Sequence, residues 1–511
     1  MKRIIGILLC CLLALSLFGC STDEGEYVPT GDGLHWEEDV TESTEPTEEA
    51  PEQELVLIYY PDKTLNPYLG SDNTNLVLYS LLYQSLFVVD SDYNVTPMLC
   101  SRYTVTENMK NYVFYIEDAT FSDGTPLTEE DVLASIQAAR TSQRFKGRFK
   151  GVDSVKIGEN GGIIFYLNTA YENFPILLDI PIVKAAEVEA DRPLGTGPYL
   201  LEQTVSGDRL RRRNDWWCDA ELAVTASSIP LVEAKSNTQI RDAFEFENVG
   251  LVCANPGSDN YADYRCDYEL WDCENGIFLY IACNLESTVF SKSSVRANLT
   301  HAIDRDLIVS KYYQDFAHSA TLPASPLSPY YNNHLASRYG YDPDKFIQAI
   351  SDHYLTGATV RILVNKADTL RLKIAREIGT MLEACGLLVE MMEHAGSDYY
   401  YYLGIGEFDI YVSQTRLSAN MDLTAFFSEN GSLRYGGLAD ETFRVLCRDA
   451  LANRGNYLNL HQEIMEDGRL CPVLFQTYSI HATRGLLTGL SPSRDNVFYY
   501  DLGKTMAEIR Y

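Results

Sequence analysis

The chain has 511 residues, of which 46% are hydrophobic and 22% charged, a composition typical of a globular protein with more than one buried core. Its formal net charge is −31 at pH 7, and residues 55–511 alone sum to about −20. This charge would repel the phosphates of nucleic acids and of anionic lipids, so we expect no nucleic-acid partner.

The N-terminus has the layout of a secretory signal peptide. Lys2 and Arg3 precede fifteen mostly apolar residues, Ile4 to Phe18, too short a stretch to be the usual span of about 20 residues. Leu17-Phe18-Gly19-Cys20 resembles the bacterial lipobox, in which the cysteine is acylated and becomes the new N-terminus. We therefore expect residues 1–20 to be a lipoprotein signal peptide with lipidation at Cys20; an uncleaved apolar anchor is the alternative. Either one leaves the body extracytoplasmic, attached to the bacterial cell membrane.

Residues 21–54 form a different kind of segment. They contain 13 acidic residues and no Lys or Arg, with many Thr, Pro and Gly. Such a segment buries too little apolar surface to offset the entropy of ordering. We expect a disordered, extended acidic linker.

Strands are predicted first in the part that follows. Leu55 to Tyr60 is a short apolar run that ends at Pro61, as in a buried strand. Apolar residues from Asn75 to Val89 surround most of a helical circumference, which predicts a helix between layers. Tyr112 to Ile116 alternates like a strand.

Turn and cap signals define the next elements. Asp123-Gly124 is a turn, and Thr128 with Asp131 has the spacing of a capping box for a helix that runs towards Arg140. Gly161-Gly162 separates two short apolar runs, as in a β-hairpin.

The second half is expected to alternate helices and strands. Ile277 to Cys283 is an unbroken apolar run, hence a strand buried on both faces. Ser293 and Ser294 are candidate N-caps of the following helix. Leu370 to Cys385 carries an apolar stripe and stops at Gly386, and strands follow near Leu387 and Phe408. This alternation predicts an α/β lobe with a largely parallel sheet.

The cysteines permit more than one interpretation. Nine lie beyond the signal segment, with no CxxC pair, and four of these (Cys253, Cys266, Cys273 and Cys283) are close in sequence. One disulfide among the four, or buried free thiols, are both compatible with this spacing. None of the eight histidines sits in a metal-ligand pair, so we expect no metal site and no cofactor.

Several motifs resemble those of the family 5 extracellular solute-binding proteins, which include dipeptide-, oligopeptide- and nickel-binding lipoproteins of ABC importers. Thr120 to Thr128 with Asp131-Val132 resembles the family's DGTP segment, and Pro193 to Tyr199 its GTGPY segment. Asn214 to Trp217 resembles the family's RN-x-x-W run, and Val295 to Arg305 its VR…AIDR helix. These runs occur in the family's order, which makes the resemblance more specific than any one of them.

The resemblance implies an α/β, two-lobed, periplasmic-binding-protein-like fold with a ligand cleft between the lobes. Lobe I would comprise residues 55–84, 190–270 and 476–511, with an inserted subdomain at 85–189. Lobe II would be 271–475. The hinge would lie near Gly276 to Asn284 and Pro472 to Ser479.

The resemblance also implies where ligand contacts would lie. In peptide-binding members, an acid of lobe II that follows a Gly-Trp pair holds the ligand's amino group; here Gln414-Thr415 and Ser418 or Ala419 occupy those positions. Asp422 matches a second family acid, and Arg416 would pair with a ligand carboxylate or phosphate, or remain a solvated or salt-bridged residue. The ligand-binding candidates are Asn75, Tyr280, Thr415, Arg416, Asn420, Asp422 and Gln476.

We therefore expect a monomeric, non-enzymatic binding protein that captures a peptide or similar small solute and delivers it to ABC permease subunits, touching the membrane only through its lipid anchor. An extracellular ligand sensor of the same fold is one alternative. A secreted hydrolase is another, although the sequence lacks a nucleophile elbow and an HExxH motif.

Overall fold

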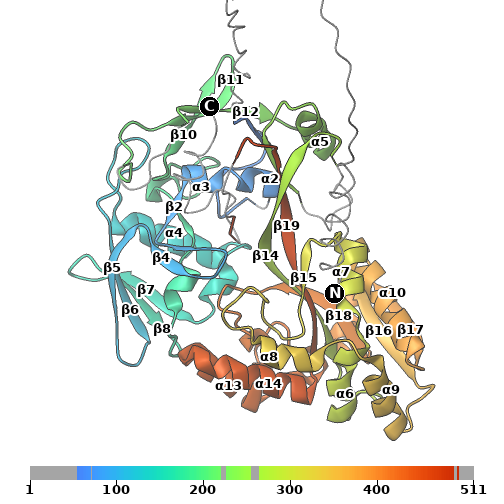
Figure 1. Ribbon diagram of the computed structural model, residues 1–511. Helices are drawn as coiled ribbons and strands as arrows, with labels where there is room; N and C mark the ends of the chain where they lie inside the picture. Colours follow the sequence, from blue (N-terminus) through green and yellow to red (C-terminus); the bar gives the residue numbers. More distant parts are fainter. Residues whose placement is uncertain (1–54, 71, 220–225, 255–263, 488–491, 494–511) are drawn as a thin grey trace, which may run out of the picture. The chain divides into compact units, whose positions relative to one another are not determined.

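A computed structural model of the protein describes residues 55–70, 72–219, 226–254, 264–487 and 492–493 (Figure 1). Their helices and strands are mixed along the chain, which confirms the α/β class. Most strands of the described residues belong to one eleven-stranded sheet. In spatial order the sheet contains β10 (Tyr199–Thr204), β11 (Gly207–Arg212), β12 (Ser228–Glu233), β1 (Leu57–Tyr59), β13 (Leu251–Ala254), β19 (Leu470–Thr483), β14 (Tyr268–Cys283), β18 (Ile410–Arg416), β16 (Thr359–Asn365) and β17 (Leu388–His394), with β15 (Ala317–Ser319) paired to β19.

Two long antiparallel strands, β14 and β19, form the middle of this sheet and lie side by side in Figure 1. Their pairing runs from Tyr268 opposite Thr483 to Ala282 opposite Leu470, with one irregularity between Glu274 and Phe278 and a second between Leu279 and Tyr280. Gly276 lies in the first irregularity at φ 72°, a conformation that glycine adopts without steric cost. The predicted crossing at Pro472 to Ser479 falls within β19, and the one at Gly276 to Asn284 falls within β14 except for Asn284, which follows the strand.

The β16 side of the sheet is built around parallel strands. β16 pairs in parallel with β17 and β18, while β18 pairs antiparallel with β14. The predicted parallel pairing therefore holds for β16, β17 and β18, but the sheet as a whole is mixed, because β14 pairs antiparallel with both β18 and β19. Ile362 of β16 shares an apolar core with α10 (Thr369–Ala384), and its neighbour Leu363 belongs to the core of α11 (Gly396–Ile405). The two helices thus cover opposite faces of β16.

The 85–189 segment contains a separate antiparallel sheet. Its strands are, in spatial order, β5 (Cys100–Val105), β6 (Asn111–Ile116), β8 (Ile163–Leu167) and β7 (Val152–Ile157). The predicted hairpin is confirmed, since β7 and β8 pair antiparallel on either side of Gly161. Two-stranded pairs are β2 (Gln84–Ser85) with β9 (Pro181–Ile182) and β3 (Phe87–Val89) with β4 (Val95–Pro97). The helix α4 (Glu129–Thr141) begins with the predicted capping box of Thr128 and Asp131.

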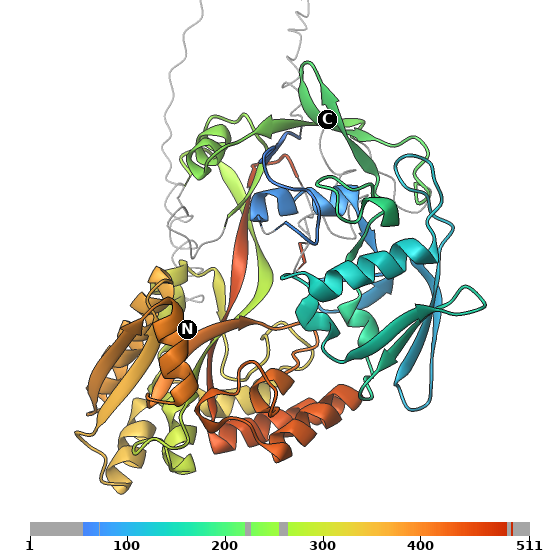
Figure 2. The ribbon, with the colours of Figure 1, turned by 180° about the vertical axis from the view of Figure 1, so that it is seen from behind.

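The remaining helices surround these sheets. The α-helices are α2 (Asn73–Leu76), α3 (Tyr79–Leu82), α5 (Asn237–Glu245), α6 (Ser293–Leu299), α7 (Arg305–Tyr313), α8 (Asn333–Ala336), α9 (Pro343–Asp352), α12 (Thr424–Phe427), α13 (Glu441–Ala452) and α14 (Tyr457–Asp467). The 3₁₀ turns are η1 (Lys146–Phe149), η2 (Phe174–Leu177), η3 (Ala185–Glu187), η4 (Thr300–Ala302), η5 (Ser337–Tyr339), η6 (Tyr435–Gly437) and η7 (Arg454–Asn456). Figure 2 shows α13 and α14, in orange-red, side by side.

Two local predictions are wrong. The apolar stretch from Asn75 to Val89 is not one helix: α2 and α3 are one turn each, and β2 and β3 follow. Because both faces of this stretch are buried, its pattern suits short buried strands as well as a helix. The helix α6 starts at Ser293 with Lys292 as N-cap, and no side chain caps it. The Ser294 hydroxyl instead lies 2.7 Å from His353 Nε2.

Three of the sequence motifs meet around one buried arginine. Arg213, which is 1% exposed, donates to the Thr120 carbonyl of the DGTP segment at 3.0 Å and to the Gly197 carbonyl of the GTGPY segment at 3.4 Å. Trp216 of the RN-x-x-W run donates its indole N–H to Thr196 O at 3.0 Å. These motifs thus satisfy one another's buried polar groups and hold the 85–189 segment against the β10–β12 strands.

The arginine of the AIDR motif has a similar structural role. Arg305 is buried, and its guanidinium donates to the carbonyls of Ala320 at 3.0 Å, Pro472 at 2.9 Å and Thr300 at 2.9 Å. Through Pro472 it joins α7 to β19. Burial lowers the pKa of this arginine, while its carbonyl partners satisfy the charged donors.

The cysteine alternatives are resolved by the structure. Cys253, Cys266 and Cys283 are thiols that form no disulfide, so none of them pairs with Cys273, the fourth of the close group. Burial raises the pKa of Cys253 to about 12, so this thiol stays protonated at neutral pH.

We predict that Gly197→Ala destabilises the protein by about 1–3 kcal/mol, because an added Cβ would lie 2.6 Å from the Leu81 carbonyl oxygen. The control is Gly340→Ala, where φ is −65° and no other atom lies within 4 Å of the new Cβ. Urea unfolding of both variants measures the difference. Equal free energies of unfolding in the two variants would show that the close approach at Gly197 does not matter.

Candidate functional site

A cavity of about 810 Å³ lies where distant parts of the chain come together. Its walls include Tyr68–Gly70, the α4 residues Ala134, Gln137, Ala138 and Thr141, the segment Ser142–Arg144, Val188, Glu189, Arg416 and Tyr478. Small-molecule sites usually measure about 300–1,000 Å³, so this volume suits a ligand of several groups. Arg416 is the one predicted ligand contact among the described lining residues.

The helix α4 forms one wall of the cavity and is fixed at its start. Asp131 accepts from Thr128 N at 2.9 Å, and its other carboxylate oxygen accepts from Ala185 N at 2.7 Å. Ser135 of the same helix accepts from Val183 N at 3.0 Å. These bonds hold α4 on the 183–185 segment, so that its last turn and the residues after it line the cavity.

A loop beside β1 forms a second wall. The Asn66 side chain donates to the carbonyls of Val188 and Ala190, each at 2.8 Å, which fastens this loop to the segment that carries Glu189. The Tyr68 hydroxyl donates to the Pro181 carbonyl, and burial raises the pKa of this phenol. The Tyr68 ring is therefore a fixed aromatic surface on the cavity.

The third wall comes from the middle of the large sheet. Arg416 is the last residue of β18, opposite Ile277 of β14, and the next residue, Leu417, donates its N–H to Gly276 O at 3.0 Å. Arg416 is exposed, whereas Tyr478 of β19 is buried. The cavity thus reaches the irregular part of the β14–β19 pair, where the hinge is predicted.

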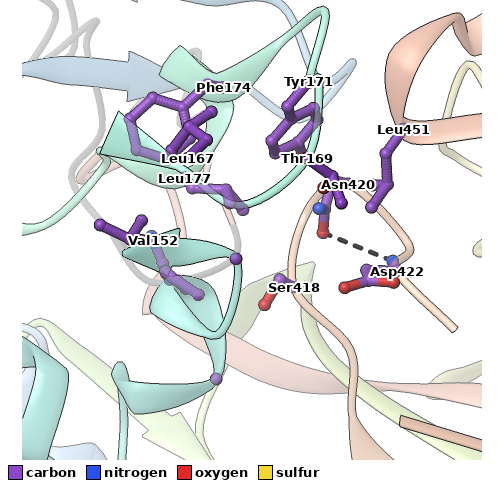
Figure 3. Close-up of a pocket in the computed structure, with 13 residues that line it drawn as sticks. Val152, Leu167, Thr169, Tyr171, Phe174, Leu177, Ser418, Asn420, Asp422 and Leu451 are labelled. Atoms are coloured by element: carbon purple, nitrogen blue, oxygen red, sulfur yellow. Dashed lines mark hydrogen bonds between the residues drawn. The ribbon is translucent and has the colours of Figure 1, made fainter. Parts of the chain in front are cut away.

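Two further predicted ligand contacts, Asn420 and Asp422, line a different pocket. Ser418, Asn420 and Asp422 lie opposite Tyr171 and Phe174 of the 85–189 segment in a pocket of about 40 Å³ (Figure 3). This volume has room for water but not for a peptide. Asn420 Oδ1 accepts from Asp422 N at 3.4 Å, and Asp422 Oδ1 accepts from Thr424 N at 2.8 Å. Both side chains therefore stabilise the conformation of the loop that carries them.

The other predicted contacts line neither of these pockets. Asn75 is fully buried, and its amide bonds the Tyr60 backbone, accepting at 2.8 Å and donating at 3.1 Å. Tyr280 is fully buried between the rings of Tyr411 and Phe426. These side chains have structural roles in this conformation.

Gln476 and Thr415 lie on β19 and β18, beside the predicted hinge. Gln476 is buried on β19 and donates to Gln414 Oε1 at 3.0 Å and to the Tyr313 hydroxyl at 3.1 Å. Thr415 is half-buried on β18, opposite Phe278. Cys20 lies outside the described residues, so its lipidation stays a prediction.

Sequence reasoning missed Tyr68, Arg144 and most of α4 as lining residues. The capping box of Thr128 and Asp131 predicted the helix α4. No feature of the sequence indicated that the last turn of α4 would line a cavity. Only the fold brings Arg144 and Arg416 to the same cavity, since 272 positions separate them in the sequence.

An ion pair joins β14 and β15 near the predicted hinge. His318 Nε2 of β15 is 3.3 Å from Asp272 Oδ2 of β14. Burial lowers the pKa of His318, but the hydrogen bond and charge of Asp272 outweigh it, so the pKa is raised overall. The same hydrogen bond lowers the pKa of Asp272. The pair is therefore charged on both sides in mildly acidic solution.

The comparison with protein families decides the identity. Residues 94–433, more than half of the chain, match the profile of the bacterial extracellular solute-binding proteins, family 5, middle region. The chain belongs to this family. The resemblance found in the sequence motifs is thereby confirmed.

Two curated relatives of this family 5 protein have peptide-related names. It is 22% identical over 306 residues to the glutathione-binding protein GsiB of Salmonella typhi, covering 55% of this chain and 57% of that protein. It is 24% identical over 319 residues to the oligopeptide-binding protein AppA of Bacillus subtilis, covering 56% of each. The chain thus spans little more than half the length of these relatives. Both names describe binding proteins.

A solved structure shares the fold over nearly its whole length. A putative peptide-binding protein AppA from Clostridium difficile superposes with a TM-score of 0.71 at 16% identity, covering 88% of this chain and 99% of that one. This likeness confirms the periplasmic-binding-protein-like fold. None of the described helices combines the length and the hydropathy needed to cross a membrane. Within the described ranges, no group of three His, Cys, Asp or Glu side chains is arranged to hold a metal ion.

We predict that His318→Gln lowers stability more at pH 5.5 than at pH 8.5. A raised histidine pKa stabilises the fold below its unfolded value of about 6.5 and loses this effect as pH rises through the folded pKa. The lowered Asp272 pKa adds stability above about pH 4. Because both groups are partly exposed, the difference should stay below about 1 kcal/mol.

Thermal unfolding at the two pH values measures this effect. The control is His334→Gln in α8, an exposed histidine for which no ion pair is found in the described part of the chain. A loss of stability that is the same at both pH values would contradict the ion pair.

Proposed function

We propose that this protein is the substrate-binding lipoprotein of an ABC importer and that it captures a peptide or similar small solute for delivery to a membrane permease. The observation that supports this most is the 810 Å³ cavity, whose walls come from the 64–70 loop, from α4, from the end of β18 and from β19. A ligand there touches parts of the chain that are far apart in sequence. Binding can therefore be linked to a movement of these parts.

The domain boundaries belong to the same proposal. Lobe I is 55–84, 190–270 and 476–511, the inserted subdomain is 85–189, and lobe II is 271–475. Among the described strands, β14 and β19 are the long pair that crosses between the two lobes. The irregularity at Gly276 supports a hinge there, because a bulge interrupts the regular ladder and permits a change in twist.

The mechanism is reversible capture without covalent chemistry. In the open form each wall of the cavity faces solvent, and in the closed form the ligand contacts both lobes. A ligand shifts this equilibrium only by the difference between its affinities for the two forms. A modest preference for closure lets the permease release the solute. Separate subunits would use ATP, since the sequence has no GxxxxGK[ST] loop.

The names of relatives support a peptide-like solute. Glutathione and oligopeptides are both built from amide-linked amino acids, and they appear in the names of GsiB and AppA. The cavity presents amide, hydroxyl and aromatic side chains, namely Gln137, Thr141, Gln143, Tyr68 and Tyr478, which suit hydrogen bonding and packing against a peptide backbone.

The location proposed is extracytoplasmic, with the lipid on Cys20 as the attachment and residues 21–54 as an acidic spacer. A diacylated N-terminus gives stable anchoring because two chains bury enough CH₂ groups. The protein works as a monomer, since one chain supplies all walls of the cavity.

We predict that the body, residues 55–511, carries one small ligand when purified and is more compact with it than without it. Native mass spectrometry identifies the ligand and its 1:1 stoichiometry. Small-angle scattering before and after the ligand is removed by unfolding and refolding should show a larger radius of gyration without it. A radius of gyration that is unchanged at full occupancy would argue against capture by hinge closure.

We predict that Cys20→Ala abolishes lipidation, because alanine has no thiol to acylate. Metabolic labelling with palmitate in the native host followed by immunoprecipitation measures this. Cys10→Ala is the control and should be labelled like the unchanged chain. Label that persists in Cys20→Ala would rule out this anchor.

A further inference from the structure

Glu172 joins two parts of the chain that are far apart in the sequence. It lies in the 85–189 segment, just after β8, and it contacts the end of α13 and the start of η7. The Glu172 N–H donates to the Leu451 carbonyl at 2.9 Å. In return, the Arg454 N–H donates to Glu172 Oε2 at 2.8 Å, although 282 positions separate these two residues. Glu172 is therefore bound through its backbone and its side chain at once.

Both bonds satisfy backbone groups that helices leave without a partner. The last carbonyls and the first N–H groups of a helix have no acceptor or donor within that helix. Leu451 lies in the last turn of α13, which ends at Ala452, and Arg454 is the first residue of η7. Glu172 thus caps the end of one helix and the start of the next, both of which belong to another part of the chain.

The backbone around Glu172 is fixed to its own segment. The Tyr171 N–H donates to the Met109 carbonyl at 3.0 Å, and the Tyr112 hydroxyl of β6 donates to the Glu172 carbonyl at 3.1 Å. The Tyr171 ring is 8% exposed and lies opposite Asn420 in the small pocket (Figure 3). Any movement of the β5–β8 sheet therefore carries Tyr171 and Glu172 with it.

The helix ends that Glu172 caps are tied in turn to the loop after β18. Tyr457 follows η7 directly, and its hydroxyl donates to the Asn420 carbonyl. The rings of Tyr330 and Tyr457 are both buried, with their centres 4.4 Å apart. The end of α13, the start of α14 and the loop that carries Asn420 thus move as one unit.

In the proposed division of the chain, Glu172 belongs to the inserted subdomain, and Leu451 and Arg454 belong to lobe II. A rotation of these parts about Gly276 would break both hydrogen bonds, so the bonds stabilise only the closed form. We infer that Glu172 is a positioning residue for solute capture: it stabilises the closed form without touching the solute. Glu172 is not among the described lining residues of the 810 Å³ cavity. The inference rests on the proposed function.

A positioning role of this kind has a signature that a ligand contact lacks. The measured affinity for a solute is its affinity for the closed form multiplied by the fraction of protein that is closed. Loss of the Glu172 bonds lowers this fraction, so it weakens the binding of every solute by the same factor and opens the protein even without a solute. Loss of a side chain that touches the solute would weaken different solutes by different factors.

Two pairs of variants test the inference on the full-length chain, purified in detergent and stripped of ligand. Glu172→Ala removes the carboxylate that accepts from Arg454. Its control is Glu159→Ala, an exposed residue of the β7–β8 turn for which no hydrogen bond or ion pair is found in the described part of the chain.

The second pair removes the same hydrogen bond from its other side. Arg454→Pro has no N–H to donate, and proline suits the first position of a helix when the residue before it is extended. Asn453 is extended, with φ −149° and ψ 110°. Arg454→Ala keeps the N–H and is the control. Thermal unfolding of all four variants checks that the fold is intact.

The first measurement is the distance between the two parts without a solute. Spin labels are introduced as unnatural amino acids at the exposed positions Glu107, in the β5–β6 turn, and Arg448, in α13. Pulsed electron paramagnetic resonance should show a larger share of long distances in Glu172→Ala and Arg454→Pro than in the unchanged chain. Both controls should give the distribution of the unchanged chain.

The second measurement is binding of a pool of tri- to pentapeptides, followed by native mass spectrometry. Glu172→Ala and Arg454→Pro should each need about fivefold more peptide for half-saturation, the typical effect of losing one hydrogen bond. The factor should be the same for every peptide that the unchanged chain binds.

The outcomes separate the inference from the proposed function. Unchanged distances and unchanged half-saturation in Glu172→Ala and Arg454→Pro would overturn the inference and leave peptide capture in place. Factors that differ among peptides, or an equal effect of Glu159→Ala, would overturn it as well. If even the unchanged chain retains no peptide, the proposed peptide capture fails, and the distances without a solute still decide whether Glu172 holds the two parts together.

Discussion

The antiparallel pairing of β14 with β19 is the constraint on which the rest of the structure depends. These strands carry the large sheet from the β13 side to the β18 side, and the register of their ladder shifts at two places, around Gly276 and between Leu279 and Tyr280. A two-strand connection of this kind resists shear, because each strand keeps the other in register, but it can twist where the ladder is interrupted. The cavity, Arg416 and the Asp272–His318 ion pair all lie at or next to the interruption around Gly276.

The features that reveal the family are separate from those that would select a ligand. Arg213 and Arg305 are buried and bond to backbone carbonyls, so the GTGPY and AIDR motifs are explained by packing and by satisfied polar groups. Such requirements are the same for any solute. The walls of the cavity, in contrast, are formed largely by side chains outside these motifs, such as Gln137, Thr141 and Gln143.

Local chemistry was predictable from the sequence, and long-range proximity was not. The capping box at Thr128, the hairpin at Gly161 and the helix that stops before Gly386 follow from interactions within a few residues, and all three are present. Asn75 and Tyr280 were predicted to contact the ligand because of their positions in the family's sequence pattern. Both side chains are buried in the structure, where Asn75 bonds the Tyr60 backbone and Tyr280 packs in the core. Arg144 carried no signal, because its place beside the cavity depends on how α4 docks on residues 183–185.

The most direct measurement of hinge closure is a distance across the cavity in solution. Spin labels introduced as unnatural amino acids at the exposed positions Lys150 and Glu429 would avoid the native thiols and report on the proposed inserted subdomain and the proposed lobe II. Pulsed electron paramagnetic resonance on protein with its co-purified ligand should give a shorter and narrower distance distribution than on protein stripped of it. Identical distributions in the two states would contradict closure about β14 and β19.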